Sequence, residues 1–312
     1  MKQNPKKAFT LIEMIIVVVI SGVLASGTFK AMEALYVRSA KAKAITDLSM
    51  QSQIVLNQIS RLLYNRIPNT VIGYDGSSAT SCTPIEDINN DTSKVLEWLS
   101  LDDEQLLSSK YGGFIDMNAS SKPNLKALDV DSNLVYANRN LIFAGSFDSG
   151  SEDISTCNGA YGWHGNDSNL SHGIDSVDTN KIVLKDTSTD KAPEYIYEKY
   201  YLTDGAYAVT RGAELSQSDL ESNCNNGNYK FPKDINFTTT LFLFYDYHPY
   251  DGETYCGDKD GNSKEGNVSI LAKDVASFGA VYENDIIRLS IDINRSIRGS
   301  NPVHISKQKA VF

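Results

Sequence analysis

The 22 residues from Ala8 to Phe29 are apolar or small throughout, except for one charged side chain, Glu13. About 20 consecutive apolar residues are enough for a helix to cross the hydrocarbon core of a bilayer. A charged side chain at that depth costs roughly 2.5–3.5 kcal/mol, so such residues are rare and usually functional. The segment therefore predicts one membrane-spanning helix in which Glu13 needs a partner.

Three lysines, Lys2, Lys6 and Lys7, precede the apolar segment, as basic residues also do in a secretory signal peptide. A conventional signal peptide has a shorter apolar region of roughly 7–15 residues, followed by a cleavage site of small residues. The sequence Ala25-Ser26-Gly27 imitates such a site. Secretion of a soluble protein after cleavage behind Gly27 is therefore an open alternative, which the length of the segment and its carboxylate disfavour.

The sequence Lys6-Lys7-Ala8-Phe9-Thr10-Leu11-Ile12-Glu13 resembles the N-terminal signature of type IV prepilins and type II secretion pseudopilins. In that family a dedicated peptidase cuts just before the Phe and methylates the new amino group. The resemblance implies cleavage between Ala8 and Phe9 and N-methylation of Phe9. Ala8 stands where Gly is commoner, and Gly22 matches a glycine of the family helix. The resemblance covers about the first 30 residues, and the rest of the chain only in architecture.

Cleavage before Phe9 would give Glu13 a partner. The new ammonium group would lie four residues before Glu13, or about 6 Å along a helix that rises 1.5 Å per residue. In a helical bundle, the carboxylate of one subunit can neutralise the amine of a staggered neighbour and relieve the cost of a buried charge. We expect Glu13 to set the register of assembly in this way. The alternative is a Glu that reaches the membrane surface, although Lys and Arg have the longer reach for this.

The charge balance bears on partners and orientation. Removal of residues 1–8 takes away three lysines and changes the formal net charge from −10 to −13. Affinity for nucleic acid backbone comes from Lys and Arg, so nucleic acid is not an expected partner. Basic residues flank both ends of the apolar segment, so the positive-inside rule alone does not orient it. The resemblance implies an inner-membrane protein that crosses once, with its C-terminal domain in the periplasm.

The four cysteines are Cys82, Cys157, Cys224 and Cys256. None has the Cys-x-x-Cys spacing of zinc or thioredoxin-like sites. An even number in an exported domain favours two disulfides. Three connectivities exist, and proximity in sequence favours Cys82–Cys157 with Cys224–Cys256. Four unpaired buried thiols are the alternative.

A long helix is predicted from about residue 9 to residue 66, and Pro68 ends it because the residue before a proline disfavours helical dihedrals. Its second half has apolar residues at three- and four-residue steps, which is one face of a helix. That face consists of Ile45, Leu48, Val55, Ile59 and Leu62, with Ser52 in the gap. We divide the chain into a leader (1–8), a transmembrane or assembly helix (9–29), its amphipathic continuation (30–67), a loop-rich variable region (68–180) and an antiparallel β-sheet region (181–312).

The region 68–180 is rich in Ser, Asn, Asp and Gly, which predicts surface loops with a short helix at 95–99 and strands at 134–136 and 141–144. From residue 181, β-branched and aromatic residues predict a sheet. The expected strands are 181–184, 195–202, 206–209, 241–245, 277–282 and 286–293. Asp204-Gly205 and Glu283-Asn284-Asp285 are read as hairpin turns. A long helix laid across an antiparallel sheet is an α+β fold, and it is also the pilin architecture.

No HExxH, GxSxG, P-loop or GxGxxG motif occurs in a usable context, so the chain is not expected to be an enzyme. Asp258, Asp260 and Asn262 form a short run of oxygen ligands of the kind that suits calcium. Its glycine comes too early for an EF-hand, and a solvated acidic loop is the alternative. The expected cofactors are none, with calcium as an open candidate.

Five asparagines follow the pattern Asp/Glu-x-Asn-x-Ser/Thr: Asn118, Asn169, Asn236, Asn267 and Asn294. This extended sequon resembles the acceptor sequence of some bacterial glycosylation systems. The composition of a chain rich in Asn, Asp and Ser is the alternative explanation. Asn294 follows a predicted strand, where access is poor.

We predict a structural subunit, a minor pilin of a type IV pilus or a minor pseudopilin of a type II secretion system, similar to the PilW-like and J-type groups. About 240 residues follow the helix, which is large for a repeating subunit and favours a tip or initiation position. Expected partners are other pilin or pseudopilin subunits through the N-terminal helix, the prepilin peptidase, the inner-membrane assembly platform and membrane lipid. The alternative is a membrane-anchored periplasmic binding protein or enzyme that is not assembled into a filament.

Overall fold

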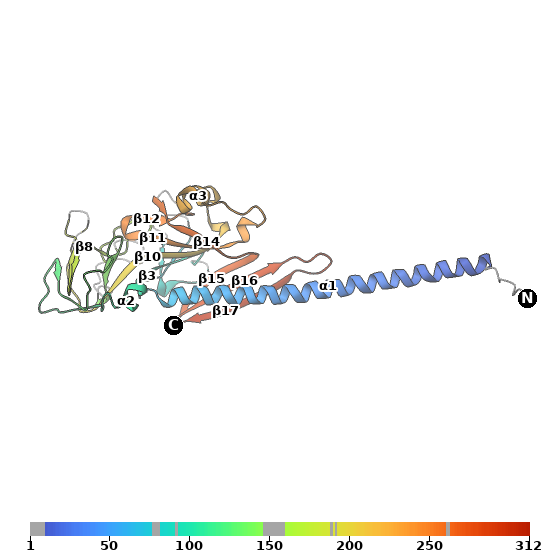
Figure 1. Ribbon diagram of the computed structural model, residues 1–312, viewed down its shortest axis with the longest axis horizontal. Helices are drawn as coiled ribbons and strands as arrows, with labels where there is room; N and C mark the ends of the chain where they lie inside the picture. Colours follow the sequence, from blue (N-terminus) through green and yellow to red (C-terminus); the bar gives the residue numbers. More distant parts are fainter. Residues whose placement is uncertain are drawn as a thin grey trace, which may run out of the picture.

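A computed structural model describes residues 10–76, 82–90, 93–145, 160–187, 190, 192–259 and 263–312. One long helix, α1 (Leu11–Tyr64), extends from a β-rich domain, and only its C-terminal half lies against that domain (Figure 1). Its 54 residues span about 80 Å at 1.5 Å per residue. The predicted α+β fold, a long N-terminal helix packed on an antiparallel sheet, is confirmed.

The C-terminal half of α1 buries one stripe of side chains. The backbone N–H of Asn65 caps the end of the helix by donating to the carbonyls of Leu62 and Leu63. The buried residues are Ala44, Leu48, Ser52, Val55, Leu56, Ile59 and Leu63. Most of the predicted face is confirmed, but Ile45 is 41% exposed and Leu62 is only half-buried. The small side chain of Ala44 faces the sheet in place of Ile45.

The stripe packs on a three-stranded antiparallel sheet in the order β15-β16-β17. These strands are β15 (Val275–Glu283), β16 (Ile286–Arg295) and β17 (Val303–Val311). Alternate residues of β16 enter the core, as predicted: Ile287, Leu289, Ile291 and Ile293 are all buried. The predicted hairpin between β15 and β16 is also confirmed. Its two turn residues, Asn284 and Asp285, have φ of 52° and 62°, as a type I′ turn requires.

A larger sheet of ten strands continues beyond the end of α1, in the order β2-β1-β3-β10-β7-β8-β9-β5, with β11 on β10 and β14 on β11. Its first five strands are β1 (Ile72–Tyr74), β2 (Cys82–Pro84), β3 (Val95–Leu101), β5 (Asn124–Leu125) and β7 (Asn140–Phe143). The other five are β8 (His172–Asp178), β9 (Lys181–Leu184), β10 (Tyr200–Arg211), β11 (Leu241–Tyr247) and β14 (Asn267–Ala272). Strands predicted at 141–144, 181–184 and 241–245 are confirmed. The region predicted as loop-rich also supplies strands to this sheet.

Short elements complete the domain. Two small strand pairs are β4 (Phe114–Ile115) with β6 (Ala127–Leu128), and β12 (Glu253–Tyr255) with β13 (Ser263–Glu265). The short helices are α2 (Asp103–Leu107) and α3 (Gln217–Asn223). The 3₁₀ turns are η1 (Ile85–Asp87), η4 (Trp163–Gly165), η5 (Gly212–Glu214), η6 (Cys224–Gly227), η7 (Phe237–Thr239) and η8 (Pro249–Asp251).

The helix predicted at 95–99 is wrong, because these residues form most of strand β3. Residues from Val95 to Ser100 are all buried, so both faces of the strand are covered and the alternation of a half-buried strand is missing. The strand predicted at 134–136 is also wrong. There the side chain of Gln105 binds the backbone of Val135, accepting from its N–H at 2.6 Å and donating to its carbonyl at 2.8 Å. A side chain thus replaces the neighbouring strand.

The hairpin turn predicted at Asp204-Gly205 is wrong, because both residues lie inside the single strand β10. The register on β3 shifts between Thr203 and Gly205, which is a β-bulge. Gly205 has φ of 148°, and the hydroxyl of Ser100 donates to its carbonyl at 3.0 Å and also to the carboxylate of Asp204. The glycine bends one strand here rather than reversing the chain. The strand predicted from Tyr195 begins only at Tyr200.

Candidate functional site

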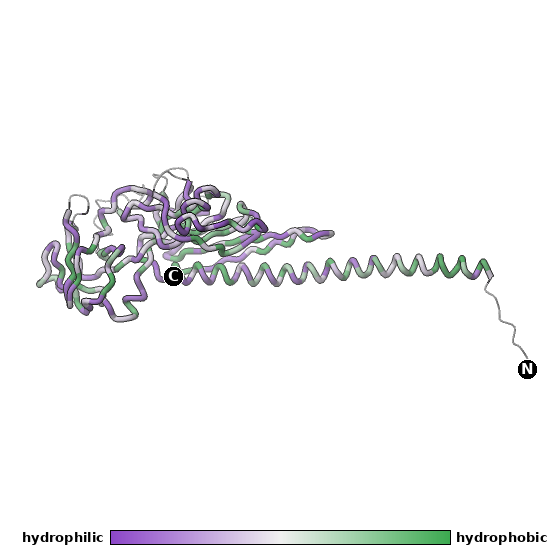
Figure 2. Tube along the Cα trace, turned by 45° about the horizontal axis from the view of Figure 1, so that its top comes forward, coloured by the Kyte–Doolittle hydropathy of each residue, from purple (hydrophilic) through white to green (hydrophobic). Residues whose placement is uncertain are grey.

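The N-terminal half of α1 leaves its apolar side chains uncovered. Leu11 is 80% exposed, Phe29 71% and Tyr36 76%. Hydrophobic residues dominate this end of the helix, whereas hydrophobic and hydrophilic residues alternate nearer the domain (Figure 2). By length and composition α1 can cross a membrane, and none of its most apolar stretch is buried against the described part of the chain. A surface of this kind marks a site that lipid or other protein covers.

The first turn of α1 is closed by a capping box. Thr10 is the N-cap, and its hydroxyl accepts from the backbone N–H of Glu13 at 3.4 Å. In return, Glu13 Oε2 accepts from the backbone N–H of Thr10 at 2.9 Å and from its hydroxyl at 2.8 Å. The pattern Thr-x-x-Glu is a sequence signature of a helix start, so Glu13 has a capping role besides the assembly role predicted for it.

The capping box leaves part of Glu13 available. Both donors from Thr10 reach Oε2, and within the described residues no group donates to Oε1. A carboxylate has about four lone-pair sites, so Glu13 can cap its own helix and still accept an ammonium group. Ala8 and Phe9 lie outside the described residues, so cleavage between them and methylation of Phe9 stay predictions.

The family model of the prokaryotic N-terminal methylation motif matches residues 3–29. This chain carries a prepilin-type N-terminal methylation motif. The matched segment contains Ala8, Phe9, Glu13 and Gly22, the residues on which the resemblance to prepilins rested. The motif supports a pilin- or pseudopilin-type protein that a prepilin peptidase processes and that assembles with other pilin subunits. The comparisons with curated proteins and with solved structures gave no match.

Two glycines of the motif, Gly22 and Gly27, face open space in the described part of the chain. A Cβ added to Gly22 or to Gly27 would meet no described atom within 4 Å. Glycine inside a helix destabilises it by roughly 0.5–1 kcal/mol relative to alanine. In membrane helices, small residues let a neighbouring helix approach closely. The positions of Gly22 and Gly27 are therefore suited to contacts with another helix.

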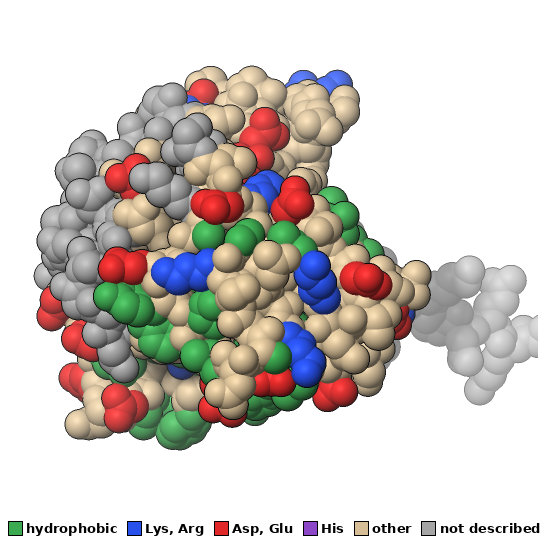
Figure 3. Space-filling model, turned by 90° about the vertical axis from the view of Figure 1, so that its left-hand side faces the viewer, with side chains coloured by type: hydrophobic (Ala, Val, Ile, Leu, Met, Phe, Trp, Pro, Cys, Tyr) green, Lys and Arg blue, Asp and Glu red, His purple; other side chains and the backbone are tan. Residues whose placement is uncertain are grey.

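The distal end of the domain, opposite the membrane helix, has a mixed surface. Lysine and arginine side chains are scattered singly among acidic and apolar ones on this face (Figure 3). Among the described residues of this face, Figure 3 shows no basic stripe of the kind that follows a nucleic acid backbone.

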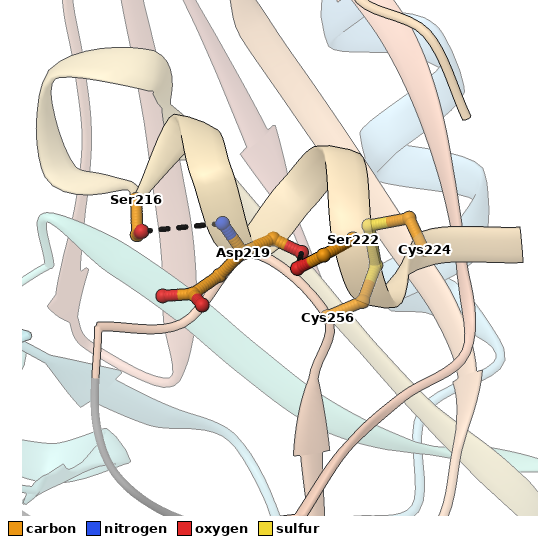
Figure 4. Close-up of a disulfide and its surroundings, with 5 residues drawn as sticks. All are labelled: Ser216, Asp219, Ser222, Cys224 and Cys256. Atoms are coloured by element: carbon orange, nitrogen blue, oxygen red, sulfur yellow. Dashed lines mark hydrogen bonds between the residues drawn. A yellow bond between two sulfur atoms is a disulfide. The ribbon is translucent and has the colours of Figure 1, made fainter. Parts of the chain in front are cut away.

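The predicted Cys224–Cys256 disulfide is present, with a Cα–Cα distance of 5.0 Å. It joins the C-cap of α3 to the segment after β12, and Figure 4 shows it at the end of α3 opposite the N-cap Ser216. Cys82 is also disulfide-bonded. Cys157 lies outside the described residues, so the Cys82–Cys157 pairing stays a prediction. The alternative of four unpaired thiols is wrong for the three described cysteines.

Asp258, a calcium candidate, is turned into the core. It is fully buried, its Oδ1 accepts from the hydroxyl of Tyr255 at 3.3 Å, and its Oδ2 lies 3.3 Å from Nδ1 of His164. The other two candidates, Asp260 and Asn262, lie outside the described residues. In the part of the chain that the structure describes, no group of three or more His, Cys, Asp or Glu side chains is placed to hold a metal ion. The calcium site stays a prediction.

His164 joins Asp258 to a second buried carboxylate. Its Nε2 lies 2.8 Å from Oε1 of Glu97, whose Oε2 accepts from the hydroxyl of Tyr247 at 2.7 Å. Burial opposes protonation of His164, but the carboxylates of Glu97 and Asp258 outweigh it and raise its pKa to about 10. The imidazole also stacks on Tyr74, with ring centroids 3.8 Å apart.

The side chains of the network around His164 are buried, so their bonds hold distant parts of the fold together. The network links β3, η4 and the segment after β12, which are far apart in sequence. His164 has φ of 54°, a left-handed conformation that few residues other than glycine adopt. Its ion pairs hold it there. No local sequence pattern signals this arrangement, because its members are brought together only by the fold.

Proposed function

We propose that this protein is a minor pilin or minor pseudopilin, cut by a prepilin peptidase before Phe9 and assembled into a filament through α1. One observation carries the proposal. The methylation motif at residues 3–29 extends into α1, and the apolar half of this helix is not buried against the described part of the chain. Such a helix needs lipid before assembly and other helices afterwards.

Glu13 is the residue through which subunits recognise their register. In the mature chain, the amine of Phe9 would lie at the helix start, and the free Oε1 of Glu13 on a staggered neighbour would accept it. Desolvation is costly for either charge alone, so the pair forms only where the stagger brings them together. Gly22 and Gly27 would allow the helices to approach closely enough for this.

The size and position of the domain support a minor subunit at a tip or initiation position. The ten-stranded sheet continues past the C-terminal end of α1, so much of the domain lies beyond the helix (Figure 1). A domain of this bulk is harder to repeat around a filament than to place once at its end. This is the feature that the PilW-like and J-type resemblance also implies.

We place the chain in the inner membrane, with its domain in the periplasm. The Cys224–Cys256 disulfide supports this orientation, because disulfides persist in the periplasm and are rare in the cytosol. The assembly platform in the same membrane would receive the processed subunit.

Mass spectrometry of the N-terminal peptide of the mature protein tests the proposal. We expect N-methyl-Phe9 as the first residue, in protein recovered from both the membrane and the filament fraction. A start at Thr28 would show a secreted protein and overturn the proposal. Processing at Phe9 in a chain that never reaches the filament fraction would instead favour a membrane-anchored binding protein or enzyme.

A further inference from the structure

The extended sequons are more frequent than the composition of the chain explains. The sequence has seven Asn-x-Ser/Thr sites: Asn90, Asn118, Asn166, Asn169, Asn236, Asn267 and Asn294. Of its 312 residues 39 are acidic, so an Asp or Glu two positions earlier is expected at about one of the seven. It occurs at five. Chance placement of acidic residues is a poor account of this excess.

The sequons at Asn267 and Asn294 lie in sheet strands, where an enzyme cannot bind them in the folded domain. Asn267 begins strand β14 and is half-buried, and its Nδ2 donates to the carboxylate of Asp246 at 3.0 Å. Asn294 lies in the middle sheet strand β16, paired with His304 of β17. An acceptor peptide must leave its sheet before an enzyme can bind it, which neither strand permits in the folded domain.

In two further sequons, a side chain that the enzyme would have to bind already has a partner within the domain. At Asn169, the hydroxyl of Ser171 is 3% exposed and accepts from Asn140 at 3.0 Å. At Asn118, the side chain of Asp116 pairs with Lys126 at 3.2 Å. The hydroxyl two residues after Asn118 is also engaged, because it donates to the carbonyl of Asp116 at 2.7 Å. In both sites the fold uses a group that an enzyme would have to recognise.

The fifth site, around Asn236, presents all three of its side chains to solvent. Asp234, Asn236 and Thr238 are exposed, and the side chain of Asp234 is 78% exposed with Lys273 only at 3.7 Å. The intervening Phe237 packs its ring 5.7 Å from that of Phe242 and anchors the turn to the core. The sequon thus lies outside the sheets but in a fixed position on the domain.

The hydrogen bonds of the Asn236 side chain involve its oxygen and leave its nitrogen available for substitution. Its Oδ1 accepts from the backbone N–H of Thr238 at 3.1 Å and from the Thr238 hydroxyl at 2.8 Å. Among the described residues, none bonds to its Nδ2. The oxygen of the amide is therefore held, while the nitrogen that would carry a substituent has no competing partner.

We propose that Asn236 is an N-glycosylation acceptor, modified by a periplasmic oligosaccharyltransferase from a polyprenyl-pyrophosphate-linked oligosaccharide. Nδ2 of Asn236 attacks the anomeric carbon of the sugar and forms a carbon–nitrogen bond. The bond from that carbon to the phosphate oxygen breaks, and the polyprenyl pyrophosphate leaves with the electron pair. The proton that the amide nitrogen loses is taken up by the departing pyrophosphate, so atoms and charge balance. The proposal rests on the proposed export of the domain to the periplasm.

Asp234 and Thr238 supply the recognition. An exposed carboxylate can make a charge-assisted pair with a guanidinium or ammonium group of the enzyme, and such bonds are stronger and more directional than neutral ones. The hydroxyl of Thr238 can donate and accept hydrogen bonds. Its present bond to Asn236 is within the sequon, so binding to the enzyme exchanges one hydrogen bond for another.

Glycopeptide mass spectrometry of protein purified from the cells that make it is the first test. We expect a glycan on the peptide that contains Asn236 and unmodified peptides at Asn267 and Asn294. The N-terminal peptide of the same sample reports processing before Phe9. Unmodified Asn236 in a chain processed at Phe9 would overturn the glycan proposal and leave the proposed function standing. A glycan on Asn236 in a chain that is not processed at Phe9 would do the reverse.

A reconstituted reaction isolates the role of the fold. The purified full chain in detergent is incubated with a bacterial oligosaccharyltransferase that accepts this sequon, together with its lipid-linked oligosaccharide. We expect the folded chain to gain one glycan, and the urea-unfolded, reduced chain to gain glycans at further sites. Modification of Asn236 in the unfolded chain alone, or of the folded chain elsewhere, would contradict the proposal.

Matched variants separate the roles of the three sequon side chains, those of Asp234, Asn236 and Thr238. Asn236→Gln and Thr238→Val should abolish modification of the folded chain, and Asp234→Asn should lower its rate at least about tenfold by removing the charge. Asp234→Glu and the control Asn294→Gln should be modified like the wild type. If Asn294→Gln lost its glycan, or if Asp234→Asn were modified as fast as the wild type, the enzyme would not recognise the Asn236 sequon as proposed.

Discussion

Thr10 and Glu13 satisfy each other at the start of α1, so Glu13 has a function even in a single subunit. Replacing an N-cap partner costs about 1 kcal/mol of helix stability. The charge of Glu13 is a separate property, because a neutral amide can also accept the hydrogen bonds of Thr10. The two roles can therefore be separated by substitution.

Glu13→Gln keeps an acceptor for Thr10 but removes the charge, whereas Glu13→Val removes both. We expect both variants to be processed before Phe9. Incorporation into filaments should fall at least about tenfold in both, because breaking a buried pair costs about 3–5 kcal/mol. Immunoblots of sheared filament fractions measure it. Normal incorporation of Glu13→Gln would show that the cap matters and the charge does not.

His164 makes the stability of the domain depend on pH. Its pKa is raised to about 10 in the folded state, from an ordinary value of 6.5. The contribution of a group with a raised pKa is complete below its unfolded pKa and is lost as pH rises through the folded one. We therefore expect the wild type to lose stability between about pH 6.5 and pH 10, measured as the midpoint of urea unfolding.

His164→Asn is the informative variant, because asparagine tolerates the positive φ of this position. It should destabilise the domain by about 3–5 kcal/mol, since the buried carboxylates of Glu97 and Asp258 would both lose the positive charge of His164. It should also flatten the pH dependence. His304→Asn is the control, since its side chain is 58% exposed, and it should leave the unfolding midpoint unchanged. If His164→Asn still lost stability between about pH 6.5 and pH 10, the pH dependence would not come from His164.

For the individual elements, the rotation of α1 on its sheet can be tested, because it determines which helix residues are buried. Leu48 is fully buried in the helix–sheet core, while Ile45 is 41% exposed, although the sequence placed both on one face. Leu48→Ala should cost about 2–5 kcal/mol of unfolding free energy. Ile45→Ala, a change of similar size, should cost less than about 1 kcal/mol. Equal losses in chemical denaturation would place the helix in another register.

Strand β10 shows why element boundaries were harder to predict than element types. An Asp-Gly pair between apolar runs is the signal of a two-residue turn. In β10 the same pair forms a bulge, because β3 pairs with the strand before and after it, while β7 pairs with residues 200–203 and β11 with residues 206–211. The pair Asn284-Asp285 does form its turn, since its two strands pair with each other. Both residue pairs are local signals of a turn, and the strands that lie alongside determine which pair forms one.

At the scale of the whole molecule, the membrane helix and the domain are separable. Residues 10–36 are exposed, and α1 meets the domain from Val37 onward. Deletion of residues 1–35 should therefore give a soluble protein with an unchanged unfolding midpoint, whereas the full chain needs detergent. Deletion of residues 1–52, which also removes Ala44, Leu48 and Ser52, should lower stability by several kcal/mol. Aggregation of the shorter deletion would show that the membrane half supports the fold.

Features that depend on neighbours along the chain could be predicted from the sequence. The apolar length of 9–29, the processing signal around Phe9, the helix period and the alternation in β16 can be read directly, because local spacing and composition carry them. The fold was needed to show that residues 95–101 form a strand, that Ala44 rather than Ile45 faces the sheet, and that His164 joins two buried carboxylates. It also distinguished Asn236 from four sites with the same sequence pattern. Each of these depends on which distant groups cover or bind a residue, and that is determined by packing across the fold.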